Sequence, residues 1–200
     1  TAVALALFLA AIGVEKAVRF NRSEKARQVA ERELEIGRRI QSGFFPTRLP
    51  EADGWELQSY FKPARQVAGD FYDAYTIGED RKLGLVVADV CDKGVGAALF
   101  MALFRSLIRV LSGEAQSEIH LNRGRFDGDV RKTLAGVVYS LNRYIAVTHD
   151  REGMFATLFI GILDPQTGVF DYVNGGHEPP VILGTDGLQA LLPPTGPAVG

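Results

Sequence analysis

A predicted β-hairpin near the middle of the chain constrains the fold more than any other sequence feature. Two runs rich in aromatic and β-branched residues, DFYDAYTI at 70–77 and KLGLVVADV at 82–90, flank a turn-forming segment at 78–80. This alternation of strand and turn residues predicts two antiparallel strands joined by a tight connection. If the strands pair through that turn, their outer ends meet, and Asp70 lies near Asp89.

The two aspartates at the outer ends of this hairpin suggest a metal site. Asp89 ends the apolar run LGLVVA, where a carboxylate is costly unless it meets a cation or several hydrogen-bond donors. Two close carboxylates repel each other unless a cation lies between them, and Mg²⁺ and Mn²⁺ prefer such oxygen ligands. The residues alone also allow structural roles, with Asp70 and Asp73 as solubilising charges at a strand edge and Asp89 as a turn former or helix cap.

Further strands and two helices are predicted around the hairpin. We expect strands at 55–61, 155–163, 169–174 and 180–183, with a turn at 164–168. The segment between the two helices, at about 113–128, is polar and contains glycine, so we expect a loop. Strands followed by helices and then by strands indicate an α+β fold with helices stacked on largely antiparallel sheets.

Each of the two predicted helices has one apolar face. The first should bury a face whose members recur at helical spacing, with Arg105 and Arg109 off it: Phe100, Leu103, Phe104, Leu107 and Leu111. The second should bury a similar set: Val130, Leu134, Val137, Leu141 and Ile145.

The N-terminal segment has a different character. The run TAVALALFLAAIGV at 1–14 is shorter than the roughly 20 residues that span a bilayer. Basic residues cluster directly after it, as on the cytoplasmic side of a membrane span: Lys16, Arg19, Arg22, Lys25 and Arg27. We therefore assign 1–15 to the end of a transmembrane helix, with a buried soluble helix as the alternative.

A helical linker is predicted at 16–46, ahead of a globular domain at 47–200. Its main helix should run from about Ser23, as N-cap, to about Ser42, before Pro46 and Pro50. Spacings of three and four residues form a short heptad seam: Ala26, Val29, Glu33, Ile36, Ile40 and Gly43. The seam alone fits a dimer and a solvated linker helix equally well. Its position between the membrane segment and the domain favours a homodimer through the helix at 23–43.

Charge and cysteine content exclude some functions. The formal net charge of −2 gives no reason to expect a nucleic-acid partner. Cys91 is the one cysteine of the sequence, so no disulfide can form within the chain. A small core residue is the simplest role for Cys91, with a redox switch as the alternative.

Three motifs resemble one known family. VAGDFYD at 67–73, VVADVCDKGVGAALFMA at 86–102 and MFATLFIGILDPQTGVFDYVNGGHEPPVIL at 154–183 are similar, in the same order, to the bacterial stage II sporulation protein E-type phosphatases. These phosphatases belong to the protein phosphatase 2C-like superfamily and include regulators of stress sigma factors. The resemblance extends from about Gln41 to Gly200. It implies a protein phosphatase 2C-like β-sandwich flanked by helices, truncated at the C-terminus and preceded by a long N-terminal helix.

The resemblance also implies a reaction and its residues. Family members bind two Mn²⁺ or Mg²⁺ ions, and a metal-bridging water attacks the phosphorus atom of a phosphoserine or phosphothreonine. By motif position, Asp70 and Asp89 become catalytic metal ligands, and Val90 becomes a ligand through its backbone carbonyl. Lys93, Asp92 and His177 are candidate second-shell or substrate residues. For His177 the favoured role is to hold its own loop, and for Asp92 it is to face solvent.

Departures from the family pattern narrow these expectations. Ala68 and Asp92 stand where the family usually has glycine. The family's downstream metal-binding aspartates do not appear before Gly200, because Asp186-Gly187 comes too early to match the first of them. From the fragment alone we therefore expect weak metal affinity and little activity.

The resulting hypothesis is a signalling enzyme at a membrane. We expect a metal-dependent protein serine/threonine phosphatase at the cell inner membrane, with its phosphatase domain in the cytoplasm. The resemblance implies a phosphorylated anti-sigma-factor antagonist as substrate. The alternative is a catalytically silent phosphatase-like module that acts as a dimeric interaction domain.

Overall fold

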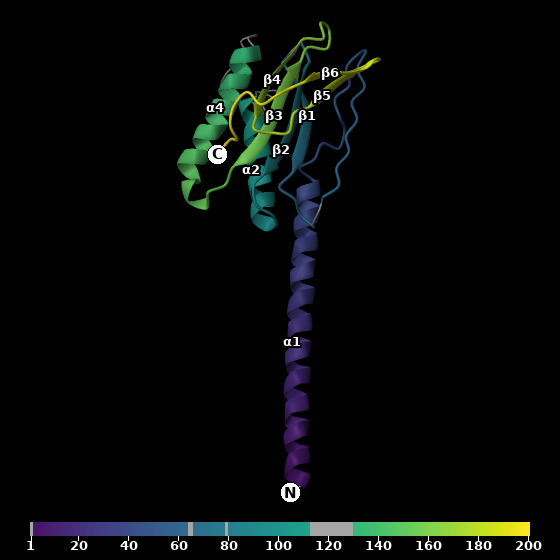
Figure 1. The fold of residues 1–200 in the computed structure, drawn as a ribbon, viewed down its shortest axis with the longest axis vertical. Helices are drawn as coiled ribbons and strands as arrows, with labels where there is room; N and C mark the ends of the chain where they lie inside the picture. Colours follow the sequence, from purple (N-terminus) through teal and green to yellow (C-terminus); the bar gives the residue numbers. More distant parts are fainter. Residues whose placement is uncertain (1, 64–65, 79, 113–129) are drawn as a thin grey trace. The chain divides into compact units, whose positions relative to one another are not determined.

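The computed structural model describes residues 2–63, 66–78, 80–112 and 130–200. The chain divides into two compact units, Thr1–Ile40 and Gln41–Gly200, and each is described by itself. The predicted loop at 113–128 lies outside the described residues. Figure 1 shows the course of the chain through the two units.

The N-terminal unit is formed by one continuous helix, α1 (Ala2–Ser42). The prediction of a separate helix with Ser23 as its N-cap is wrong, because the helix runs through Ser23 and the Ser23 hydroxyl donates to the Phe20 carbonyl one turn earlier. Val29, Ile36 and Ile40 of the predicted seam are exposed. Within the described part of the chain, no helix is both long enough and apolar enough to cross a membrane.

The second unit is built on a four-stranded antiparallel sheet in the order β1-β2-β3-β4. Its strands are β1 (Phe71–Ile77), β2 (Lys82–Val90), β3 (Ala156–Leu163) and β4 (Phe170–Gly175). A two-stranded ribbon follows, with β5 (Val181–Gly184) and β6 (Gly187–Leu191). The α+β fold predicted from the sequence is confirmed, and the strand β6 was not expected.

The strand expected at 55–61 is not formed. Ala52 and Trp55 make only an isolated bridge, and the residues after Trp55 lack strand pairing. Two aromatic side chains of the segment make tertiary contacts without a β-ladder. The Trp55 indole N–H donates to the Pro165 carbonyl at 3.0 Å. The centre of the Phe61 ring lies 6.3 Å from the centre of the Tyr72 ring on β1. Aromatic content therefore reflected side-chain packing here and not backbone pairing.

Two helices cover one face of the sheet: α2 (Val95–Leu111) contacts β1 and β2, and α4 (Val130–Thr148) contacts β3 and β4 (Figure 1). A short 3₁₀ helix, η1 (Asp150–Glu152), follows α4. The apolar face predicted for α4 is confirmed at four positions that are almost fully buried: Leu134, Val137, Leu141 and Ile145.

The apolar face predicted for α2 is only partly right. Phe104 is fully buried as expected, but Leu111 is exposed. The other fully buried members of α2 lie at Ala97, Met101 and Ile108. The true sheet-facing side is therefore rotated toward Arg105 and Arg109, which the sequence had placed away from the core.

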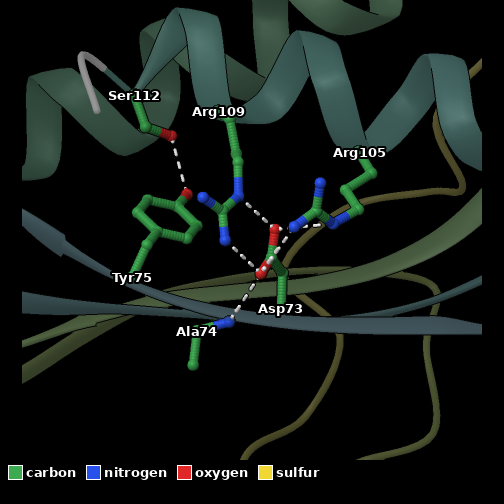
Figure 2. A network of polar contacts seen from close by, with 6 residues as sticks. All are labelled: Asp73, Ala74, Tyr75, Arg105, Arg109 and Ser112. Atoms are coloured by element: carbon green, nitrogen blue, oxygen red, sulfur yellow. Dashed lines mark hydrogen bonds and ion pairs between the residues drawn. The ribbon is translucent and has the colours of Figure 1, made fainter. Parts of the chain in front are cut away.

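A buried ion-pair network explains this rotation (Figure 2). Asp73 on β1 is 3% exposed and points toward α2. The Arg109 guanidinium donates to both carboxylate oxygens of Asp73, at 2.6 and 2.7 Å, and Arg105 Nε lies 3.0 Å from Asp73 Oδ2. A carboxylate buried beneath a helix needs such partners. The Arg109 guanidinium also lies 5.1 Å from the centre of the Tyr75 ring, whose hydroxyl bonds Ser112 at 2.8 Å.

We predict that Asp73→Asn lowers the free energy of unfolding by about 3 kcal/mol, because it leaves two partly buried guanidinium groups without their anion. Urea unfolding followed by circular dichroism measures this loss. Glu152→Gln, which removes the exposed partner of His149, is the control and should change stability by less than about 0.5 kcal/mol. A loss below about 1 kcal/mol for Asp73→Asn would contradict a structural role for the network.

Candidate metal centre

Asp70 and Asp89 lie side by side at one end of the sheet. Phe71 pairs with Ala88 in the β1–β2 ladder, so the next position outward sets Asp70 opposite Asp89. Both aspartates are exposed, whereas Asp73 is buried on the helix-covered face. The adjacency predicted from the hairpin thus agrees with the observed register.

The electrostatics of the pair indicate two carboxylates that compete for one proton. The pKa of Asp89 is raised from its usual 3.8 to about 6. Partial burial is the largest cause, followed by a side-chain hydrogen bond with Asp70 and by the negative charge of Asp70, while the positive charge of Lys93 lowers the pKa. A divalent cation relieves the same repulsion without a proton, so the pair fits such an ion.

The backbone around the pair is closely packed. A methyl group added at Gly69 would lie 2.6 Å from the Val90 carbonyl oxygen, so only glycine fits there without a shift. The Val90 carbonyl oxygen therefore lies close to the segment that carries Asp70. Gln41 holds the preceding residue, since its side-chain amide donates to the Ala68 carbonyl at 2.7 Å and accepts from the Ala68 N–H at 3.0 Å. Sequence reasoning did not single out Gln41.

The connection from β2 to α2 contains two residues in the left-handed region. Asp92 has φ 73° and Gly94 has φ 88°. The left-handed φ accounts for the glycine that the family usually carries at the Asp92 position, and aspartate is one of the residues that tolerate this conformation. The Asp92 and Lys93 side chains are exposed. Lys93 is close enough to act on the pKa of Asp89.

His177 lies next to the pair, beyond the end of β4. Its Nδ1 is 2.8 Å from the Thr157 hydroxyl, and Thr157 stands opposite Asp89 in the β2–β3 ladder. The His177 backbone N–H donates to Asn174 Oδ1 at 2.8 Å, and Asn174 is fully buried. Thr157 and Asn174 were missed at the sequence level, because their roles depend on strand register across separate segments.

A cavity of about 660 Å³ opens beside Asp70 and His177. Its wall includes the aromatic side chains Tyr72 and Phe159 and residues of the segment 56–61. A mainly apolar hollow with a few polar groups at one side is the usual form of a ligand site. The cavity therefore places space for a ligand next to Asp70 and His177.

The donor set suits a hard cation. Asp70 and Asp89 offer carboxylate oxygens and Val90 a carbonyl oxygen, and such ligands favour Mg²⁺ and Mn²⁺. Within the described ranges, no group of three or more His, Cys, Asp or Glu side chains is arranged to hold a metal ion. The residues present thus fit part of a coordination sphere, with water able to fill other positions.

We predict that the metal-free protein loses stability as the pH rises from about 4 through about 6. In this range the unfolded chain has already released the Asp89 proton, whereas the folded state still binds it, and this advantage of the folded state is lost by about pH 6. Asp89→Asn should remove this pH dependence of the free energy of unfolding. At pH 7.5 in EDTA it should stabilise the metal-free protein by about 1 kcal/mol, a value reduced for solvent screening. Urea unfolding with EDTA at several pH values measures it. Asp92→Asn is the control and should keep the wild-type slope; equal slopes for Asp89→Asn and wild type would contradict the prediction.

Comparisons with known proteins identify the family of this chain. The family model described as stage II sporulation protein E (SpoIIE) matches residues 79–200. Protein IcfG of Synechocystis sp. (strain ATCC 27184 / PCC 6803 / Kazusa) is 47% identical over 178 residues, which cover 84% of this chain and 28% of that protein. Phosphoserine phosphatase RsbU of Bacillus subtilis (strain 168) is 26% identical over 147 residues, which cover 74% of this chain and 38% of that protein.

A solved structure supports the fold. The SiaA-PP2C domain of Pseudomonas aeruginosa matches with a TM-score of 0.56 over 88% of this chain and 64% of that one, at 15% identity. The chain spans only 28% and 38% of the length of the two curated relatives above. The family match itself covers more than half of the chain. The chain therefore belongs to the stage II sporulation protein E (SpoIIE) family.

Proposed function

We propose that this chain contributes catalytic metal ligands to a metal-dependent protein serine/threonine phosphatase. The single observation that carries the proposal is the facing pair Asp70 and Asp89, whose mutual repulsion calls for a cation. Membership of the SpoIIE family and similarity to a protein named phosphoserine phosphatase support phosphate ester hydrolysis as the reaction.

Asp70, Asp89 and the Val90 carbonyl would hold the metal. When bound, two Mn²⁺ or Mg²⁺ ions supply a water of lowered pKa and a positive charge for the phosphoryl oxygens. The chain's own residues then have defined tasks. The β1–β2 ladder keeps the two carboxylates adjacent, Gly69 permits the close approach of the Val90 carbonyl, and Lys93 adds a positive charge near Asp89.

The substrate and setting are proposed from the family. A phosphoserine or phosphothreonine on an anti-sigma-factor antagonist protein is the proposed substrate. Homodimerisation through the helix at 23–43, attachment to the inner membrane through the N-terminal segment and a cytoplasmic phosphatase domain stay predictions. The exposed Val29, Ile36 and Ile40 are compatible with a dimer seam.

We expect the full-length protein with Mn²⁺ to hydrolyse a phosphoserine peptide, and Asp70→Asn or Asp89→Asn to lower kcat at least about 100-fold, because each removes a ligand charge. Release of inorganic phosphate measures the rate. Asp150→Asn, which changes an exposed carboxylate on η1, is the matched control and should keep wild-type activity. Failure of the wild-type protein to hydrolyse any phosphopeptide with Mn²⁺ or Mg²⁺ would favour a silent interaction module.

A further inference from the structure

His177 is held in place by three separate features, one at its side chain and two at the backbone. The Thr157 hydroxyl bonds Nδ1 at 2.8 Å, and the buried Asn174 accepts the His177 backbone N–H at 2.8 Å. The preceding Gly176 has φ 71°, which favours glycine, and a methyl group there would lie 3.1 Å from the Ala198 backbone nitrogen. A ring fixed in this way at the edge of a cavity is preorganised to contact a ligand.

Asn174 in turn is fixed by the segment that follows β6. Its side-chain amide donates to the Leu192 carbonyl at 3.1 Å, and its backbone N–H donates to the Thr195 hydroxyl at 3.0 Å. The Asn174 carbonyl accepts from the Thr195 N–H at 2.7 Å. The turn that carries His177 is therefore supported by a network of its own, independent of the Thr157 contact.

The strand register places this ring in the row of the aspartates. Asp70 lies opposite Asp89, and Asp89 pairs with Thr157. His177 and Asp70 line the same cavity, and the charge of Asp70 acts on the His177 ring. A phosphate group held at the Asp70–Asp89 pair would therefore be adjacent to the imidazole.

The chemistry of the ring suits a neutral hydrogen-bond donor. Burial lowers the pKa of His177, against smaller opposing effects of Glu178 and Asp70. A neutral imidazole has one N–H and one acceptor nitrogen. In the tautomer in which Nδ1 accepts from the Thr157 hydroxyl, the ring proton is on Nε2. Within the described residues, Nε2 has no hydrogen-bond partner in the structure, so its N–H is available to a ligand.

We propose that His177 contacts the substrate by donating a hydrogen bond from Nε2 to an oxygen of the phosphate monoester, and that Thr157 is the positioning residue that orients the ring. The inference rests on the proposed phosphatase function and adds a residue to it. A hydrogen bond to an anionic oxygen is about twice as strong as a neutral one, so it contributes to binding and to the transition state. The competing explanation is that His177 only holds its turn.

Two substitutions separate these explanations. His177→Asn keeps an amide where Nδ1 meets Thr157 but loses the far nitrogen, whereas His177→Gln keeps a donor near the Nε2 position and loses the Thr157 contact. We expect kcat/KM of the full-length Mn²⁺ enzyme for a phosphoserine peptide to fall at least about 20-fold in His177→Asn and only about 5-fold in His177→Gln, the loss expected from removal of the Thr157 contact alone. Rescue by Asn and not by Gln would overturn the proposal.

Thr157 is tested in the same way. Thr157→Val removes the hydroxyl and should lower kcat/KM about 5-fold, while Thr157→Ser retains it and should stay within about 2-fold of wild type. Thermal unfolding followed by circular dichroism identifies any variant that fails to fold. Equal activity of folded Thr157→Val and wild type would contradict the positioning role.

A binding measurement is independent of turnover. In the Mg²⁺-loaded full-length protein with ¹⁵N-labelled histidine, inorganic phosphate should shift the Nε2 resonance of His177, and the metal-free protein should show a smaller shift. An unchanged Nε2 resonance at saturating phosphate would overturn the inference. If the wild-type protein shows that shift but hydrolyses no phosphopeptide, the proposed phosphatase function fails while the phosphate contact stands.

Discussion

The register of β1 against β2 is the constraint on which the site and its support both depend. It sets Asp70 opposite Asp89 at one end and turns Asp73, three residues along, to the other face of the sheet. Because side chains alternate between faces, a slip by one residue would exchange the two faces of the strand. One hairpin therefore presents a carboxylate pair to solvent and an anion to α2.

The negative charge of Asp73 and the charges of the Asp70–Asp89 pair are compensated in different ways. Asp73 is buried, and two arginines from α2 neutralise it within the protein. Asp70 and Asp89 lie at the sheet end without a comparable arginine pair among the described residues, and partial burial, followed by the hydrogen bond and the charge of Asp70, raises the pKa of Asp89. The first arrangement stabilises the fold, whereas the second leaves a charge repulsion that a bound cation can relieve. Such unrelieved repulsion is typical of functional sites.

Local sequence patterns were sufficient for part of this structure. The strands of the hairpin, its turn and the buried face of α4 follow from residue alternation and helical spacing, and the adjacency of Asp70 and Asp89 follows from the hairpin. The sheet-facing side of α2 could not be predicted from helical spacing, because Arg105 and Arg109 count as surface residues until their partner Asp73 is known. The support of His177 was also hidden, since Thr157 and Asn174 act through pairings between distant segments. The prediction of a strand at 55–61 is wrong because Trp55 and Phe61 make side-chain contacts with other segments and not strand pairings.

Mn²⁺ binding to the full-length protein, measured by isothermal titration calorimetry, tests the central claim most directly. If Asp70 and Asp89 share one metal site, Asp70→Asn and Asp89→Asn should each weaken Mn²⁺ binding at least about 10-fold, and the double variant should be weakened by much less than the product of the two effects. Wild-type affinity in either single variant, or fully multiplicative losses in the double variant, would contradict a shared site.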